Sequence, residues 1–217
     1  MILGPKEHIY IGSLPPYGEL GGAMAVFDPK TFKVVDNYRH LIKNQSIVSL
    51  AYEPKSGLVW GGSGIMGGGG TTPSEKEALI FAFDPEKKQK IFETALESGL
   101  ESYPAICSAE GLVFIATRKK ILVFDPIIFK VTDTINLPGT VLEVSLGTHS
   151  DGFIYGLTSQ AVFGIEPKTR KVMFVDPSPV PIRCGFALTD QAVYLGSGAH
   201  LWCYVLKTPN TTMQGWK

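Results

Sequence analysis

The hydrophobic positions of the chain fall in short runs that are rich in β-branched and aromatic residues, and tight turns separate these runs. Runs of about four to eight such residues, bounded by Gly, Pro, Asn or Asp, are typical of β-strands. No window carries the apolar stripe of an amphipathic helix over several turns, and only residues 94–102 offer a helical turn. The pattern therefore predicts an all-β protein built from many short strands.

Two sequence phrases alternate along the chain. The first is an apolar strand that ends in an acidic residue and a proline, and a second strand follows it. The other phrase is a short strand that ends in a small or hydroxyl residue. The acidic residues of the first phrase are Asp28, Asp84, Asp125 and Glu166, with later intervals of 41 residues, and the other phrase occupies residues 9–13, 59–63, 113–117, 154–158 and 193–197.

Each repeat has the same order: strand a, a tight turn, strand b, a variable loop, strand c, an Asp-Pro turn and strand d. A four-stranded unit of about 40–45 residues is the period of a β-propeller blade. We therefore predict one propeller domain with five blades, in which residues 207–210 replace the last Asp-Pro turn. Either the ring closes with five blades, or the chain is the C-terminal part of a larger ring. The predicted blades cover residues 1–43, 44–101, 102–138, 139–179 and 180–217.

Two segments of the chain carry a family resemblance. The phrase DPKTFKVV at residues 28–35 and the hairpin GPKEHIYIGS at residues 4–13 resemble the repeats of bacterial YVTN-type and quinoprotein-like propellers, which are WD40-like. The resemblance covers nearly the whole chain and implies a fold. Quinoprotein enzymes carry a Trp-containing docking repeat, but Trp60, Trp202 and Trp216 do not recur at one blade position, so no cofactor is predicted. Propellers serve many functions, and the fold alone names none of them.

Composition excludes several classes of partner. The 217 residues include 20 Lys and Arg and 20 Asp and Glu, so no net charge draws the chain to nucleic acid or to an anionic membrane. No signal peptide or membrane-length apolar run is present. We therefore expect a cytoplasmic location unless the chain is a fragment of an exported protein. Self-association is expected if the ring is incomplete.

Residues that often carry chemistry are sparse and scattered. Cys107, Cys184 and Cys203 lie in apolar runs, so we expect them to be buried and to form neither a disulfide framework nor a zinc site. The four histidines lack metal-ligand spacing, and His149, in a tight turn, is expected to be exposed. No helix with Lys-Ser/Thr follows the glycine run 67–70, so no phosphate loop is predicted. No metal site is predicted.

Three long loops come from the first two blades and project from one rim, opposite the Asp-Pro turns. They are residues 13–22, 37–46 and 62–77, whereas the corresponding loops of the later blades are short. Functional residues concentrate on such loops over a rigid scaffold. Amide side chains would supply the polar contacts, and Tyr17 the apolar wall. The candidate ligand-binding residues are Tyr17, Glu19, Arg39, His40, Asn44, Gln45, Glu75 and Glu77.

Two functional hypotheses follow. The first is a non-catalytic binding or interaction module that uses this rim and the mouth of the central channel for a protein, small-molecule or carbohydrate ligand. The alternative is a propeller hydrolase or lyase acting on a sugar derivative or lactone. Strand a should line the channel, and its four complete copies carry only Glu143 and Arg183 as charges. Because metal-assisted chemistry needs several converging ligands, this favours the binding module, and no catalytic residue is assigned.

Overall fold

The computed structural model describes residues 1–206, 215 and 216, which form five antiparallel sheets of four consecutive strands. Each sheet is called a blade and is numbered along the chain. Blade 1 contains β1 (Ile2–Leu3), β2 (Ile9–Gly12), β3 (Ala23–Asp28) and β4 (Lys33–Arg39). Blade 2 contains β5 (Ser46–Glu53), β6 (Leu58–Gly64), β7 (Ile80–Asp84) and β8 (Gln89–Thr94).

The remaining three blades repeat this plan. Blade 3 contains β9 (Ile106–Ala109), β10 (Leu112–Ala116), β11 (Lys120–Asp125) and β12 (Lys130–Asn136). Blade 4 contains β13 (Val141–Thr148), β14 (Ile154–Thr158), β15 (Ala161–Glu166) and β16 (Lys171–Pro177). Blade 5 contains β17 (Cys184–Leu188), β18 (Ala192–Ser197), β19 (His200–Val205) and β20 (Gly215–Trp216).

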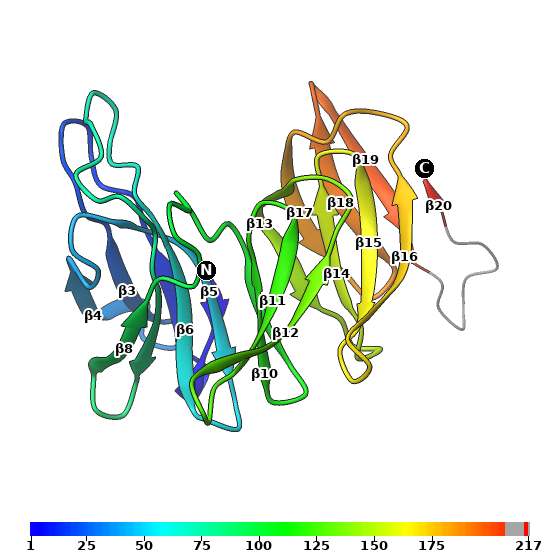
Figure 1. Cartoon of the computed structure of the whole chain (residues 1–217). Coiled ribbons are helices and arrows are strands. Elements are labelled where there is room, and N and C mark those ends of the chain that lie inside the picture. The colour runs from blue at the N-terminus through cyan, green and yellow to red at the C-terminus, as the bar shows by residue number, and fades with distance from the viewer. Residues whose placement is uncertain (207–214, 217) are drawn as a thin grey trace.

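The blades follow one another around a central axis, and the first strand of each blade is the innermost (Figure 1). The predicted all-β propeller of five four-stranded blades is confirmed. The described residues contain no α-helix. A short 3-10 turn, η1 (Pro5–Glu7), stands between β1 and β2, and residues 94–102 contain no helix. The predicted turn at residues 207–210 lies outside the described residues.

The acidic residue of the repeated Asp-Pro phrase ends the third strand of each of blades 1–4. Asp28 accepts hydrogen bonds from the Thr31 hydroxyl (2.7 Å) and the Lys30 amide (2.8 Å), which hold its pKa below the ordinary value. The Lys87 amide lowers the pKa of Asp84 in the same way. These carboxylates cap the turn, as expected for Asp before a tight turn. The turns lie at the bottom of Figure 1, on the rim opposite the long loops.

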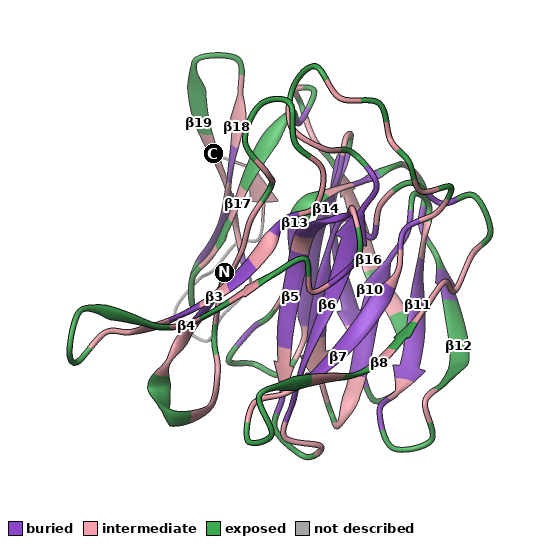
Figure 2. Ribbon diagram, turned by 90° about the vertical axis from the view of Figure 1, so that its left-hand side faces the viewer, coloured by how far each residue is buried: buried purple, intermediate pink, exposed green. Residues whose placement is uncertain are grey.

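The core lies between successive blades. Trp60 of β6 is fully buried, and its ring lies 5.0 Å from that of Phe124 in blade 3 and 6.0 Å from that of Phe92 in blade 2. The strands β6, β10 and β14 of the middle blades are buried on both faces, whereas β3 and β19 are buried on one face only (Figure 2). In the described residues, blade 5 does not pack against blade 1 as consecutive blades pack against each other.

Two expectations about single residues are wrong for reasons of packing. Cys107 is buried as expected, but Cys184 is exposed and Cys203 is only half-buried. Both lie on the face of blade 5 that no further blade covers. His149 is buried rather than exposed, because its ring packs edge-on against Tyr155 (5.4 Å) and its Nδ1 accepts the Asp151 amide N–H (3.2 Å).

Candidate functional site

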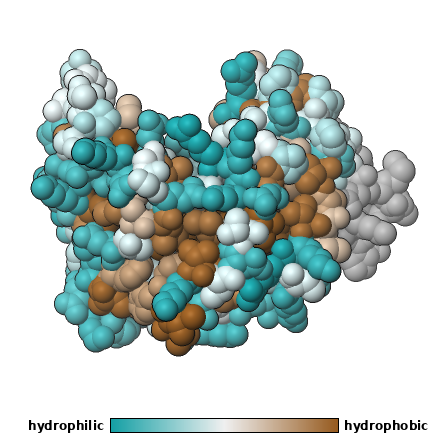
Figure 3. All heavy atoms as spheres, viewed as in Figure 1, coloured by the Kyte–Doolittle hydropathy of each residue, from teal (hydrophilic) through white to brown (hydrophobic). Residues whose placement is uncertain are grey.

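Two of the predicted long loops pack against each other and form a projection that we call the knob. They are residues 13–22 and the loop predicted at residues 62–77, which spans residues 65–79 between β6 and β7. The Gly18 amide donates to the Gly69 carbonyl (2.9 Å), and the Gly68 amide donates to the Glu19 carbonyl (2.9 Å). The Tyr17 ring lies beside Gly69 and Gly70. The knob projects at the upper left of Figures 1 and 3. The glycine run thus serves loop–loop packing.

Amide side chains of the third long loop hold the base of the knob. Gln45 is buried and donates to the Glu77 carbonyl (3.0 Å), while its Oε1 accepts a hydrogen bond from Ser63 (2.5 Å). Asn44 donates to the Glu75 carboxylate (3.0 Å). A buried amide side chain normally forms hydrogen bonds, and Gln45 forms its hydrogen bonds within the protein. These bonds connect the knob to blade 2.

The eight candidate ligand-binding residues therefore divide into groups. Asn44, Gln45, Glu75 and Glu77 are brought together, but in contacts that hold the loops. Tyr17 and Glu19 are exposed on the knob. Arg39 pairs with Ala23 on the side of blade 1 away from blade 2, and His40 lies against Gly21 with a left-handed backbone (φ 52°). Their assignment to a ligand site stays a prediction.

The hydroxyl residue at the end of the second phrase, not assigned a role from the sequence, closes the loop that follows it. Ser13 accepts the Ala23 amide (3.1 Å) and Ser63 accepts the Leu79 amide (2.7 Å). Thr117 donates to the Lys120 carbonyl (3.3 Å), and Thr158 is 3.4 Å from that of Ala161. The recurrence of a hydroxyl residue at the same position of successive blades is the sequence feature from which this role could have been predicted. A hydrogen bond between this hydroxyl and the backbone at or just before the start of the third strand closes short loops in blades 3 and 4 and long ones in blades 1 and 2.

Gly68 provides a test of the knob. A Cβ at this position would lie 1.8 Å from the Pro16 carbonyl oxygen, so Gly68→Ala should force the two loops apart. We expect hydrogen exchange of residues 16–22 and 67–71 to rise at least about tenfold, because the loop–loop hydrogen bonds open. Gly69→Ala is the matched control, since its Cβ would meet only the Tyr17 ring at 3.1 Å. Equal exchange in both variants would contradict the described packing.

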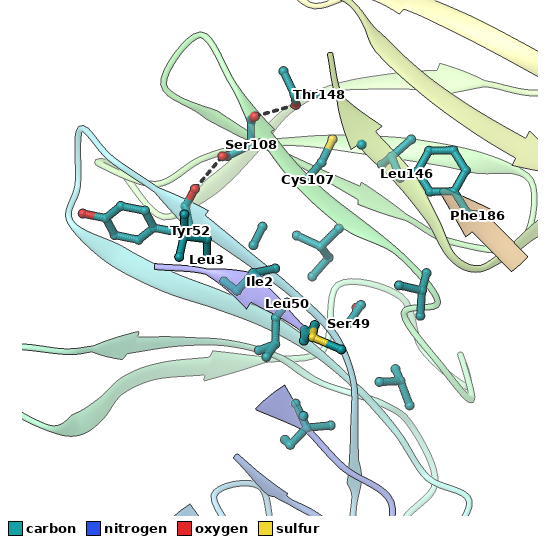
Figure 4. A pocket seen from close by; sticks show the side chains of 18 residues that line it. Ile2, Leu3, Ser49, Leu50, Tyr52, Cys107, Ser108, Leu146, Thr148 and Phe186 are labelled. Atoms are coloured by element: carbon teal, nitrogen blue, oxygen red, sulfur yellow. Dashed lines mark hydrogen bonds between the residues drawn. The ribbon is translucent and has the colours of Figure 1, made fainter. Parts of the chain in front are cut away.

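A cavity of about 420 Å³ lies on the central axis (Figure 4). First strands of all five blades contribute to its wall, and hydroxyls join three of them. Ser108 of β9 donates to the Tyr52 carbonyl of β5 (2.6 Å), and Thr148 of β13 donates to the Ser108 carbonyl (2.7 Å). The eighteen lining residues include no Asp, Glu, His, Lys or Arg. The predicted channel charges Glu143 and Arg183 are not among them.

Two further observations concern the described residues. No three His, Cys, Asp or Glu side chains gather there in a group that could hold a metal ion. The same residues include no helix with the length and apolar character needed to cross a membrane.

The comparisons with known proteins address the fold. No protein-family model matches the chain, and no curated protein matches its sequence. The structure resembles that of the RRP9 WD40 repeats with a TM-score of 0.70 and 8% identity over 95% of this chain and 59% of that one. It resembles Saccharomyces cerevisiae Sqt1 with a TM-score of 0.61 and 13% identity, over 91% and 52% of the two chains. The fold is that of a WD40-type β-propeller.

A third similar structure comes from the mitotic checkpoint complex, with a TM-score of 0.60 and 12% identity over 94% of this chain and 65% of that one. The chain thus spans between about half and two thirds of the length of these three chains. Identities this low show the fold alone. A bacterial origin and a YVTN-type or quinoprotein-like subtype stay predictions.

Proposed function

We propose that the protein is a non-catalytic module that binds a protein partner through the knob. The observation that carries the proposal is the exposure of three large apolar side chains there: Leu14 is 65% exposed, Tyr17 84% and Met66 57%. Tyr and Met are enriched in protein interfaces, because they bury much apolar area and, for Met, adapt to the partner's shape. The hydrogen bonds at the base of the knob hold these side chains in place before binding, which lowers the entropy cost of association.

The central cavity supports a binding role rather than the alternative hydrolase or lyase. Hydrolysis or elimination needs a general acid or base within reach of the substrate, and the lining residues offer hydroxyls, one thiol and apolar groups. Burial raises the pKa of the Cys107 thiol to about 12, so it is a poor nucleophile near neutral pH. Similar structures include a chain from the mitotic checkpoint complex, an assembly of proteins, which agrees with a protein partner.

Affinity capture tests the proposal. The doubly substituted variant Tyr17→Ser, Met66→Ser should fold normally, because both side chains are exposed, but should lose at least about tenfold in the recovery of a specific partner. The matched control is Ile127→Ser, Ile128→Ser, which removes two exposed apolar side chains (66% and 55%) from the opposite rim. A partner lost with the first variant and kept with the control supports the proposal. Identical sets of captured proteins for all three would refute it.

A further inference from the structure

The phrase that ends in a small or hydroxyl residue has an apolar residue at its first position in every blade. The side chain at this position packs against the preceding blade, so its burial shows whether that neighbour is present. Val59, Val113, Ile154 and Val193, in blades 2–5, are fully buried. Ile9, their counterpart in blade 1, is only half-buried. The sequence of blade 1 therefore provides the same kind of face as the other blades, but among the described residues no blade covers it.

The side chain at the next position of the same phrase packs against the following blade. Its residues in blades 1–4 are Tyr10, Trp60, Phe114 and Tyr155, and all four are buried. Tyr194, their counterpart in blade 5, is half-buried. In the described residues, blade 5 therefore has no neighbour on the face that would contact a following blade, and blade 1 has none on the face that would contact a preceding blade. The two uncovered faces are the two halves of one inter-blade interface.

Each face carries a row of apolar residues that runs across neighbouring strands, four in blade 1 and three in blade 5. In blade 1 the residues Leu3, Ile9, Phe27 and Val34 pair side by side across β1–β4, and Leu3 is 66% and Val34 60% exposed. The blade 5 face contains Ala187, Tyr194 and Cys203, which pair across β17–β19, and Leu201, which is 76% exposed. Contiguous apolar surface of this kind marks an interaction site.

We propose that two copies of this chain associate so that the blade 5 face of each packs against the blade 1 face of the other. At each of the four internal junctions, a face of the blade 5 kind already packs against a face of the blade 1 kind. The proposed contact therefore continues an interface that the molecule forms with itself. A two-fold axis covers both faces of both copies with one repeated contact, as in most closed dimers.

Charge does not oppose this association. The chain has 20 basic and 20 acidic residues, so two copies experience no net repulsion. The row of Leu3, Ile9, Phe27 and Val34 and the row of Ala187, Tyr194 and Cys203 contain no charged side chain. Arg39, which pairs with Ala23, is on the blade 1 face at the end of the strand pair, two rows away. A second copy supplies both missing faces at once, whereas another partner must offer a sheet with the same apolar alternation. Further blades of a larger ring are the competing occupant, and the test distinguishes them.

Sedimentation equilibrium of the full chain and three variants tests the pairing. Val34→Glu and Leu201→Glu each place a charge on one face, and Ile127→Glu, at an equally exposed position outside both faces, is the control. The wild type and the control should reach twice the monomer mass of 23.6 kDa. Each face variant should raise the dissociation constant at least about 100-fold, because burying an unpaired charge costs several kcal/mol. All three variants should keep the wild-type circular dichroism.

The other outcomes overturn the proposal. A wild type that stays monomeric up to about 100 µM would leave both faces to further blades or another protein. Dimers in all variants would place the contact elsewhere. If only one of the two face variants dissociated, each face would pack against the same face of the other copy, and not blade 5 against blade 1. A mass that keeps rising with concentration would show an open chain of copies instead of a closed pair.

The native cysteines give a second readout in the unmodified protein. Cys184 and Cys203 lie on the blade 5 face, and Cys107 is buried elsewhere. Alkylation of Cys184 and Cys203 should be fast in dilute protein and at least about tenfold slower where the dimer forms. In the Leu201→Glu variant it should be fast at every concentration, and Cys107 should stay unreactive throughout. Alkylation independent of concentration in a wild-type dimer would exclude this face.

Discussion

Replacing Trp60 by alanine is expected to lower the free energy of unfolding by about 3–5 kcal/mol, the range measured when a buried aromatic residue is truncated. The indole is fully buried between blades 2 and 3. Its ring contacts Phe92 in blade 2 and two rings of blade 3, Phe124 and Phe129. The substitution therefore removes contacts within one blade and across a blade junction at the same time.

Urea unfolding followed by circular dichroism measures this loss. The control Ile127→Ala removes a side chain that is mostly exposed, so its effect should stay within about 0.5 kcal/mol. Trp60→Phe should lie between the two, because an aromatic ring remains in contact with its neighbours. A loss below about 1 kcal/mol for Trp60→Ala would contradict the tight packing of this junction.

The second large effect is expected at the base of the knob. Gln45→Ala leaves the Glu77 carbonyl without its donor and removes one partner of the buried Ser63 hydroxyl, which keeps the Leu79 carbonyl (2.8 Å). Ser63→Ala leaves the Leu79 amide and Gln45 Oε1 without their partner. Each substitution should cost about 1–3 kcal/mol, the usual penalty for a buried polar group without a hydrogen bond. Hydrogen exchange in residues 65–79 should rise as well, because the loop loses its anchor.

A double-mutant cycle separates this contact from general loss of packing. Gln45 and Ser63 touch directly, so the two substitutions together should cost less than the sum of the single costs, with a coupling of about 0.5–3 kcal/mol. Ser74→Ala is the control, since the hydrogen bonds of Ser74 to Asn44 and Glu75 lie at the surface. Strict additivity of Gln45→Ala and Ser63→Ala would show that the hydrogen bond between them contributes nothing.

The repeated phrases were sufficient to predict the blades, because each blade uses local signals. Alternating apolar residues define the strands, and the Asp before proline caps the turn that joins the third strand to the fourth. The sequence could not reveal which faces are covered. Ile9 and Val59 occupy the same position of the same phrase, yet only Val59 is fully buried. A blade carries the pattern for two neighbours whether or not both are present.

The position of the long loops was predictable, but the role of their residues was not. The loops around Asn44 and Gln45 do come together on one rim, as their strand connections require. An amide side chain has the same donors and acceptors for a ligand as for a backbone carbonyl, and only the fold determines which it meets. Gln45 meets the Glu77 carbonyl. The predicted exposure of His149 was wrong for a similar reason, because a residue in a tight turn can still lie beneath a neighbouring ring.

Each sheet consists of four consecutive strands, and in the described residues no strand from one end of the chain joins a sheet at the other end. All pairings within a sheet therefore connect segments that are close in sequence, a topology that favours rapid folding. On the ribosome, a blade can complete its hydrogen bonds as soon as its fourth strand emerges, without waiting for the last residues to be translated. The nascent protein should then grow blade by blade from its N-terminus, with each finished sheet serving as the template on which the next one packs.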